Sequence, residues 1–155
     1  MYSDLVFLEL VDFPKAIKYA EEGLKIAIEN DYPAAAAYAY IYLPMYYIGF
    51  GDFRKAIEYS LEGLEFRRKV VEMTYSSEGM TVLALAYART GDLQKAIETA
   101  EEAMQTSKET GNLVGFSFVL TILGEVYRIM GEWDRAYEYY VQALEIAGKS
   151  ELRNG

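Results

Sequence analysis

The sequence predicts an all-α protein built as a stack of antiparallel helix pairs. Four segments of this 155-residue chain align without a gap, starting at Val11, Gly51, Gly91 and Gly131, so the period is 40 residues (51 − 11, then repeated twice). Self-similarity at a fixed period is typical of repeat architectures. One such repeat cannot bury its apolar face alone, so we expect neighbouring repeats to stack on one another.

Each repeat is predicted to contain a helix, a tight turn and a second helix. A glycine after an apolar segment suits the left-handed residue that ends a helix. Asp52 and Asp92 directly follow such glycines, where a carboxylate can cap the next helix. Beyond the turn, apolar and small residues such as Ala96, Ile97 and Ala100 recur at spacings of three and four, which is the helical period.

Small residues occupy two positions of the second helix in every repeat, seven residues apart. These positions hold Ala16, Ala56, Ala96 and Ala136, followed by Gly23, Gly63, Ala103 and Ala143. Because positions seven apart share a helix face, we interpret them as places where a neighbouring helix approaches closely. The pattern predicts about 3.75 repeats and seven or eight helices in a single domain spanning residues 1–155.

The composition favours binding over catalysis. The chain has no cysteine and no histidine, which excludes disulfides and thiolate sites and removes the commonest general base and metal ligand. We therefore expect no enzyme activity and no cofactor. The formal net charge of −9 argues against binding to nucleic acid or to an anionic membrane surface, because both need basic patches.

The sequence gives no sign of export or membrane insertion. Its N-terminus lacks the order of basic, apolar and small residues that marks a signal peptide. The most apolar stretch, residues 34–50, is too short to span a bilayer, so we expect a cytoplasmic protein. Adjacent pairs such as Glu21/Glu22 and Glu101/Glu102 diverge by about 100° on a helix, and we predict that they are solvated rather than catalytic.

A family resemblance covers nearly the whole chain. The residues that resemble the tetratricopeptide consensus in order and spacing are Leu123, Gly124, Tyr127, Gly131, Ala136, Tyr140 and Ala143. The usual unit is about 34 residues long, so the chain resembles a longer variant of this family. The resemblance implies a right-handed superhelix in which the first helix of each pair lines a concave groove that binds peptides or helices.

The register of the family assigns positions to this groove. The residues that the resemblance places there are Tyr38, Ile41, Met45, Ile48, Glu78, Thr81, Leu85, Arg89, Phe118, Thr121, Glu125 and Arg128. Tyr42 and Tyr46 join these candidate partner-binding residues because they belong to a cluster of tyrosines in the same stretch. The groove is thus expected to be apolar and aromatic in its first part and mixed and charged in its last. Some members of the family clamp a C-terminal carboxylate with lysine, arginine and asparagine, and that set is missing here.

Two features of the most apolar stretch each have two interpretations. Six tyrosines, at positions 32, 38, 40, 42, 46 and 47, serve either as core and inter-repeat packing or as an exposed surface for a partner. Pro44 lies inside a predicted helix, where proline costs about 3 kcal/mol. It is either a tolerated kink or a bend that opens the groove.

We therefore predict a scaffold that binds a protein or peptide through a hydrophobic segment of the partner. The alternative is a regulatory domain of a larger protein that senses a peptide or small ligand. Self-association is a third possibility, because the flank of the first repeat is left uncovered and a second copy can cover it.

Overall fold

The structure, a computed structural model, describes residues 12–70 and 77–153, and these residues form seven helices. The helices are α2 (Phe13–Glu29), α3 (Pro33–Phe50), α4 (Phe53–Val70), α5 (Ser77–Thr90), α6 (Leu93–Thr110), α7 (Leu113–Ile129) and α8 (Trp133–Arg153). They fall into two compact units that divide between Met73 and Thr74. We call the unit of α2–α4 unit 1 and the unit of α5–α8 unit 2. The all-α prediction is confirmed, and a single domain over 1–155 stays a prediction.

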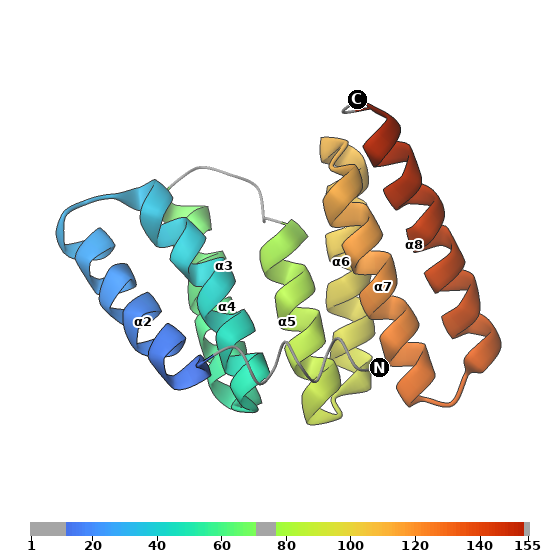
Figure 1. Ribbon diagram of the computed structural model, residues 1–155, viewed down its shortest axis with the longest axis horizontal. Helices are drawn as coiled ribbons and strands as arrows, with labels where there is room; N and C mark the ends of the chain where they lie inside the picture. Colours follow the sequence, from blue (N-terminus) through green and yellow to red (C-terminus); the bar gives the residue numbers. More distant parts are fainter. Residues whose placement is uncertain (1–11, 71–76, 154–155) are drawn as a thin grey trace. The chain divides into compact units, whose positions relative to one another are not determined.

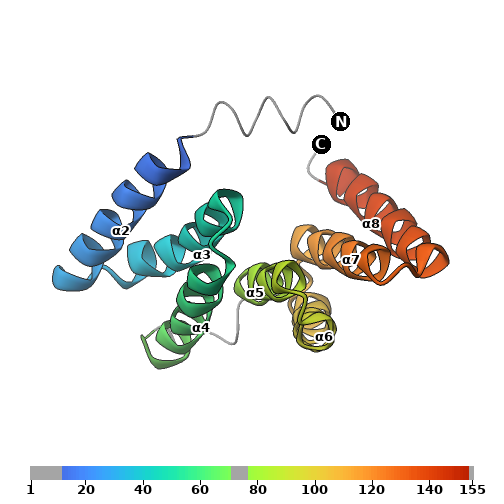
Figure 2. The ribbon, with the colours of Figure 1, turned by 90° about the horizontal axis from the view of Figure 1, so that it is seen from below.

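Within each unit, helices that follow one another in sequence pack side by side (Figures 1 and 2). In unit 1, α3 packs against both α2 and α4. In unit 2, α6 packs against α5 and α7, α8 packs against α7, and α5 also touches α7. Each unit is therefore a stack of antiparallel helices, as the repeat pattern predicts.

The repeat glycines end their helices in the left-handed conformation. Gly51, Gly91 and Gly131 have φ angles of 95°, 85° and 79°, which side chains other than glycine rarely adopt. At each turn, the amide after the glycine donates to the carbonyl of a tyrosine five residues earlier, at 2.9–3.0 Å. These three predicted turns are confirmed, whereas the one at Val11 lies outside the described residues.

Aspartates cap the helices that follow these turns. The carboxylates of Asp12, Asp52 and Asp92 accept a hydrogen bond from the backbone amide three residues later, at 3.1, 3.1 and 3.4 Å. A further turn in each unit was missed from the sequence. Asp31 and Gly111, two periods apart, both have positive φ, at 57° and 69°.

The small residues of the later repeats allow close helix packing, as predicted, whereas Gly23 of the first is exposed and a Cβ atom added there would meet nothing within 4 Å. Ala56 and Ala96 are fully buried and Ala136 is 2% exposed. A Cβ atom added to Gly63 would lie 2.6 Å from the Cβ of Tyr40 on α3, so only glycine allows this approach. The register of the sequence therefore predicts which residues lie in the contact between the two helices of a pair.

An aromatic contact also recurs with the 40-residue period. Lysine or arginine side chains lie over tyrosine rings eight residues earlier in the sequence, at distances of 4.7–5.5 Å to the centroid. The pairs are Tyr47 with Lys55, Tyr87 with Lys95, and Tyr127 with Arg135. A cation over an aromatic face is attracted by the ring quadrupole. Each pair therefore stabilises the contact between the end of one helix and the start of the next.

Helix α3 continues through Pro44 without ending. Pro44 is buried, and the equivalent residues one and two periods on, Ala84 and Gly124, are buried as well. The proline thus occupies a core position where its ring replaces a small side chain.

Candidate interaction surfaces

Helix α3 presents an exposed apolar face in unit 1. Tyr38, Tyr42 and Met45 are 63%, 49% and 40% exposed. Their spacing of four and three residues places them on one side of the helix. Large apolar side chains that are exposed together are unusual on a surface without a binding role.

The other predicted residues of α3 lie at the margins of this face. Ile41, Tyr46 and Ile48 are half-buried. Both interpretations of the tyrosine cluster therefore hold for part of it. Tyr47 is buried and Tyr40 half-buried, while Tyr32, like Tyr38 and Tyr42, is exposed.

In unit 2 the structure brings three predicted residues into one charged cluster. Arg128 donates two hydrogen bonds of 2.8 Å to the carboxylate of Glu125. Arg89 of α5 lies 3.8 Å from the same carboxylate, and the hydroxyl of Tyr140 donates to it at 3.2 Å. Arg128, followed by the other partners, lowers the pKa of Glu125 below its usual value. The two arginines are nearly half exposed, so the cluster presents net positive charge to a partner.

The remaining predicted residues of unit 2 are less uniform. Leu85 and Phe118 are half-buried, and Thr121 is exposed with its hydroxyl bonded to the carbonyl of Ser117 at 3.0 Å. Glu78 is half-buried and accepts a 2.6 Å hydrogen bond from Asn112.

Thr81 needs a correction. It is fully buried, and its hydroxyl donates to the carbonyl of Ser77 in its own helix. The family register places it on the inward side, but this side of α5 is covered by packing, so Thr81 offers no surface to a partner.

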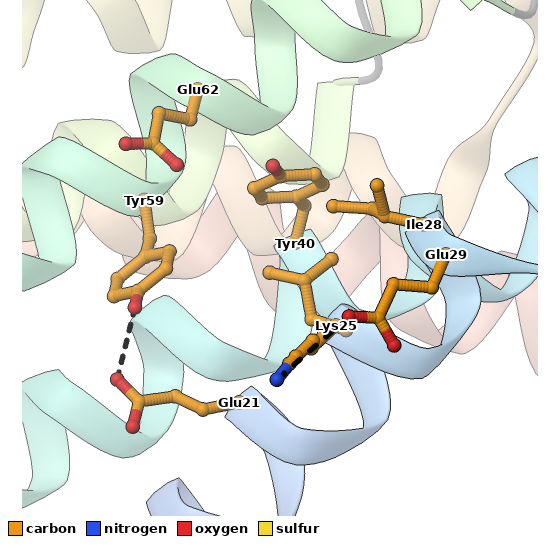
Figure 3. A pocket seen from close by; sticks show the side chains of 8 residues that line it. Glu21, Lys25, Ile28, Glu29, Tyr40, Tyr59 and Glu62 are labelled. Atoms are coloured by element: carbon orange, nitrogen blue, oxygen red, sulfur yellow. Dashed lines mark hydrogen bonds and ion pairs between the residues drawn. The ribbon is translucent and has the colours of Figure 1, made fainter.

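Unit 1 also has a hollow between α2 and α4, which was not predicted from the sequence (Figure 3). It has a volume of about 410 Å³ and is lined by Glu21, Leu24, Lys25, Ile28, Glu29, Tyr40, Tyr59 and Glu62. A neighbouring hollow shares Tyr40 and Glu62 and continues along α4 to Lys69. The residues come from three helices, so no local motif indicates the site.

Glu21 is not merely solvated, contrary to our expectation. Its carboxylate accepts hydrogen bonds from the hydroxyls of Tyr47 at 2.6 Å and Tyr59 at 2.9 Å. The bond from Tyr47 is the main cause that lowers the pKa of Glu21. The two tyrosine rings stack with their centroids 5.5 Å apart. Burial and the adjacent carboxylate raise the pKa of both tyrosines, which therefore stay neutral donors.

No group of three or more carboxylates within 12–70 and 77–153 is arranged to hold a metal ion. None of the helices described is both long and apolar enough to cross a membrane.

Comparisons with known proteins decide the family. Models of the tetratricopeptide repeat match residues 77–110 and 119–153. The chain contains tetratricopeptide repeats, and both matched segments lie in unit 2. Repeats of this family are generally protein–protein interaction modules and typically lack enzymatic activity. Among curated proteins, none matches the sequence.

Solved structures share the fold. BtubC (BKLC) from P. vanneervenii has a TM-score of 0.69 at 24% identity, over 88% of this chain and 57% of BtubC. A P. anserina protein with nearly identical TPR-like repeats has a TM-score of 0.65 at 20% identity, over 90% of this chain and 68% of that one. The apo form of RapI has a TM-score of 0.64 at 11% identity, over 93% of this chain and 64% of RapI. The chain thus spans little more than half of BtubC.

Proposed function

We propose that this chain is a protein-interaction module that binds a hydrophobic peptide or helix along the exposed face of α3. The observation that carries the proposal is the row of Tyr38, Tyr42 and Met45, all at least 40% exposed on one side of the helix. Tyrosine supplies a large contact area at low entropic cost and is enriched at binding hot spots. An apolar face of this kind suits a partner that offers apolar side chains.

The charged cluster of unit 2 supports a second contact of a different kind. Arg89 and Arg128 share Glu125 as a counter-ion, so they can also pair with an acidic residue of a partner. Exposed ion pairs contribute little affinity, about 0.2–1 kcal/mol each. We therefore propose that the face of α3 supplies most of the binding affinity for a partner, and that this cluster helps to select which partner binds.

The test is affinity capture from cells of the source organism with three forms of the chain. The first is the wild type, the second carries Tyr38→Glu and Met45→Glu, and the third carries Tyr137→Glu. Tyr137 lies on α8 and is 70% exposed, so it is a matched control for charge on an exposed tyrosine. We expect mass spectrometry to find proteins that the wild type and the control retain and the double variant loses.

Equal capture by the double variant would place the binding surface elsewhere. Light scattering of the purified chain over a range of concentrations addresses the remaining prediction of self-association. A mass above that of one chain, lost in the double variant alone, identifies the partner on α3 as a second copy.

A further inference from the structure

Unit 1 has a second candidate surface on the opposite side of α3 from the proposed binding face. Tyr38 and Tyr40 are two residues apart, which is about 200° around a helix. Tyr40 and Tyr59 line the hollow between α2 and α4 (Figure 3). Leu24 lines it as well, and we call these three residues its floor. This hollow and its continuation along α4 share Tyr40 and Glu62. We call the two together the outer groove.

The rim of the outer groove carries an excess of negative charge. Four carboxylates line it, from Glu21, Glu29, Glu62 and Glu65, against the two ammonium groups of Lys25 and Lys69. Lys25 lies 3.8 Å from Glu29, and Lys69 lies 2.8 Å from Glu65. The hydroxyls that bind Glu21 are neutral. Arg68 also lies 3.7 Å from Glu65, and Lys55 attracts the carboxylate of Glu21. The negative charge that remains beside the aromatic floor is therefore mainly that of Glu62.

An apolar floor with a negative rim matches one kind of side chain. Lysine and arginine lay their aliphatic stems along apolar surface and keep the charged group in water. Their cationic groups also attract aromatic faces, by about 0.5–1 kcal/mol at exposed sites. An acidic segment would be repelled by the rim, and a wholly apolar one would leave the carboxylates without a counter-charge.

We propose that the outer groove binds a basic segment of a partner protein. A lysine or arginine stem lies on Tyr40 and Leu24, and its cationic group pairs with Glu62. This surface is independent of the exposed face of α3, so a single partner or two different partners can occupy the two faces.

Unit 2 provides an internal comparison for the proposal. The residues two periods later than Ile28, Tyr40 and Glu62 are Lys108, Leu120 and Gln142. Leu120 is 1% exposed, so it cannot form an accessible floor. Lys108 lies over the ring of Phe116, with its ammonium 5.3 Å from the ring centroid. Gln105 stands where unit 1 has Lys25, so the equivalent surface of unit 2 carries as many cations but one carboxylate fewer, and one of its cations lies where unit 1 has the apolar Ile28.

The comparison supplies substitutions that the fold already accommodates at the same register. The triple variant Ile28→Lys, Tyr40→Leu and Glu62→Gln gives the outer groove the residues of unit 2 at these three positions, while Lys25 and the other lining residues are kept. The single variant Glu62→Gln removes one charge with little change in shape. Glu102→Gln, at an exposed site on α6, is the matched control for the loss of one negative charge.

The experiment measures fluorescence anisotropy of a labelled twelve-residue peptide of alternating arginine and leucine. A second peptide replaces every arginine with citrulline, its neutral analogue. We expect the arginine peptide to bind the full chain more tightly than the citrulline peptide. Its affinity should fall as sodium chloride is raised, because salt screens exposed charges. Glu62→Gln should weaken binding by about threefold, the scale of one exposed ion pair.

The triple variant should lose the preference for arginine over citrulline, while Glu102→Gln should bind as the wild type does. Circular dichroism checks that each variant keeps its helical content. Equal affinity for the two peptides, or an unchanged preference in the triple variant, would overturn the proposal. Loss of the arginine peptide in the Tyr38→Glu, Met45→Glu variant would assign it to the other face of α3 and also overturn the proposal. The outer groove can fail this test while the face of α3 still binds its partner, and the reverse also holds.

Discussion

Helices α2–α4 of unit 1 and α6–α8 of unit 2 are the same construction two periods apart, yet they present different surfaces. Their helices begin at Phe13, Pro33 and Phe53 in unit 1, and at residues 93, 113 and 133 in unit 2. The stacked tyrosines of unit 1, Tyr47 and Tyr59, are matched by Tyr127 and Tyr139 with centroids 5.4 Å apart. The contacts that hold each unit together are therefore repeated.

The outward positions differ at the same register. Met45 of the apolar face of α3 corresponds to Glu125, and Ile48 corresponds to Arg128. A core position must satisfy close packing, so few side chains fit it. An outward position is free of that constraint, so it can be apolar in one unit and charged in the other. The comparison shows that the buried positions repeat from unit to unit, whereas the outward positions, which a partner can contact, do not.

The largest expected effect tests whether the two cores are equivalent. Leu43 and Leu123 occupy the same register and are both fully buried. Leu43→Ala and Leu123→Ala should each lower the free energy of unfolding by about 3 kcal/mol, because each leaves a cavity. Urea denaturation measures both. Met45→Ala, at an exposed outward position, should change the free energy of unfolding by about 0.5 kcal/mol or less. A large loss from only one leucine variant would break the equivalence of the units.

The sequence predicted the repeated contacts well because they depend on local rules. Gly51, Gly91 and Gly131 were located by their spacing, and their positive φ follows from how helices end. The buried alanines follow from the same register. These features need no knowledge of how distant segments meet.

The candidate sites could be predicted only in part. The exposed face of α3 was found because family register indicates Tyr38 and Met45, and the cluster of tyrosines adds Tyr42. The outer groove was missed, since Glu21, Tyr40 and Glu62 come from three helices and no spacing links them. Thr81 was wrongly placed on a surface, because register gives the direction of a side chain but not what covers it.

A middle-sized effect concerns a buried position at which unit 1 departs from the repeat. Pro44 is buried inside α3, where unit 2 has Ala84 in α5 and Gly124 in α7. Pro44→Ala should stabilise the chain by about 1–2 kcal/mol, part of the roughly 3 kcal/mol that proline costs inside a helix. Thermal unfolding followed by circular dichroism measures the change. A loss of stability would instead show that the proline ring fills space that alanine leaves empty.

The smallest effect separates the units by their response to pH. Glu21 accepts two tyrosine hydroxyls in unit 1, whereas Glu101, two periods on, is exposed. Glu21→Gln should lower the free energy of unfolding by about 1 kcal/mol at pH 7, which is the scale of hydrogen bonds to a partly exposed charge. Glu101→Gln is the matched control and should cost less.

The sign of the pH dependence follows from the lowered pKa of Glu21 in the folded chain. A carboxyl with a depressed folded-state pKa stabilises the fold fully above its ordinary value of 4.5 and loses that contribution as the pH falls through the folded-state value. The stability difference between the wild type and Glu21→Gln should therefore be constant from pH 7 to about pH 5 and shrink below it. Urea denaturation at pH 7, 5 and 3 measures this difference. If the difference instead grew on acidification, the carboxylate would not be the form of Glu21 that Tyr47 and Tyr59 stabilise, and the contrast with Glu101 would need another cause.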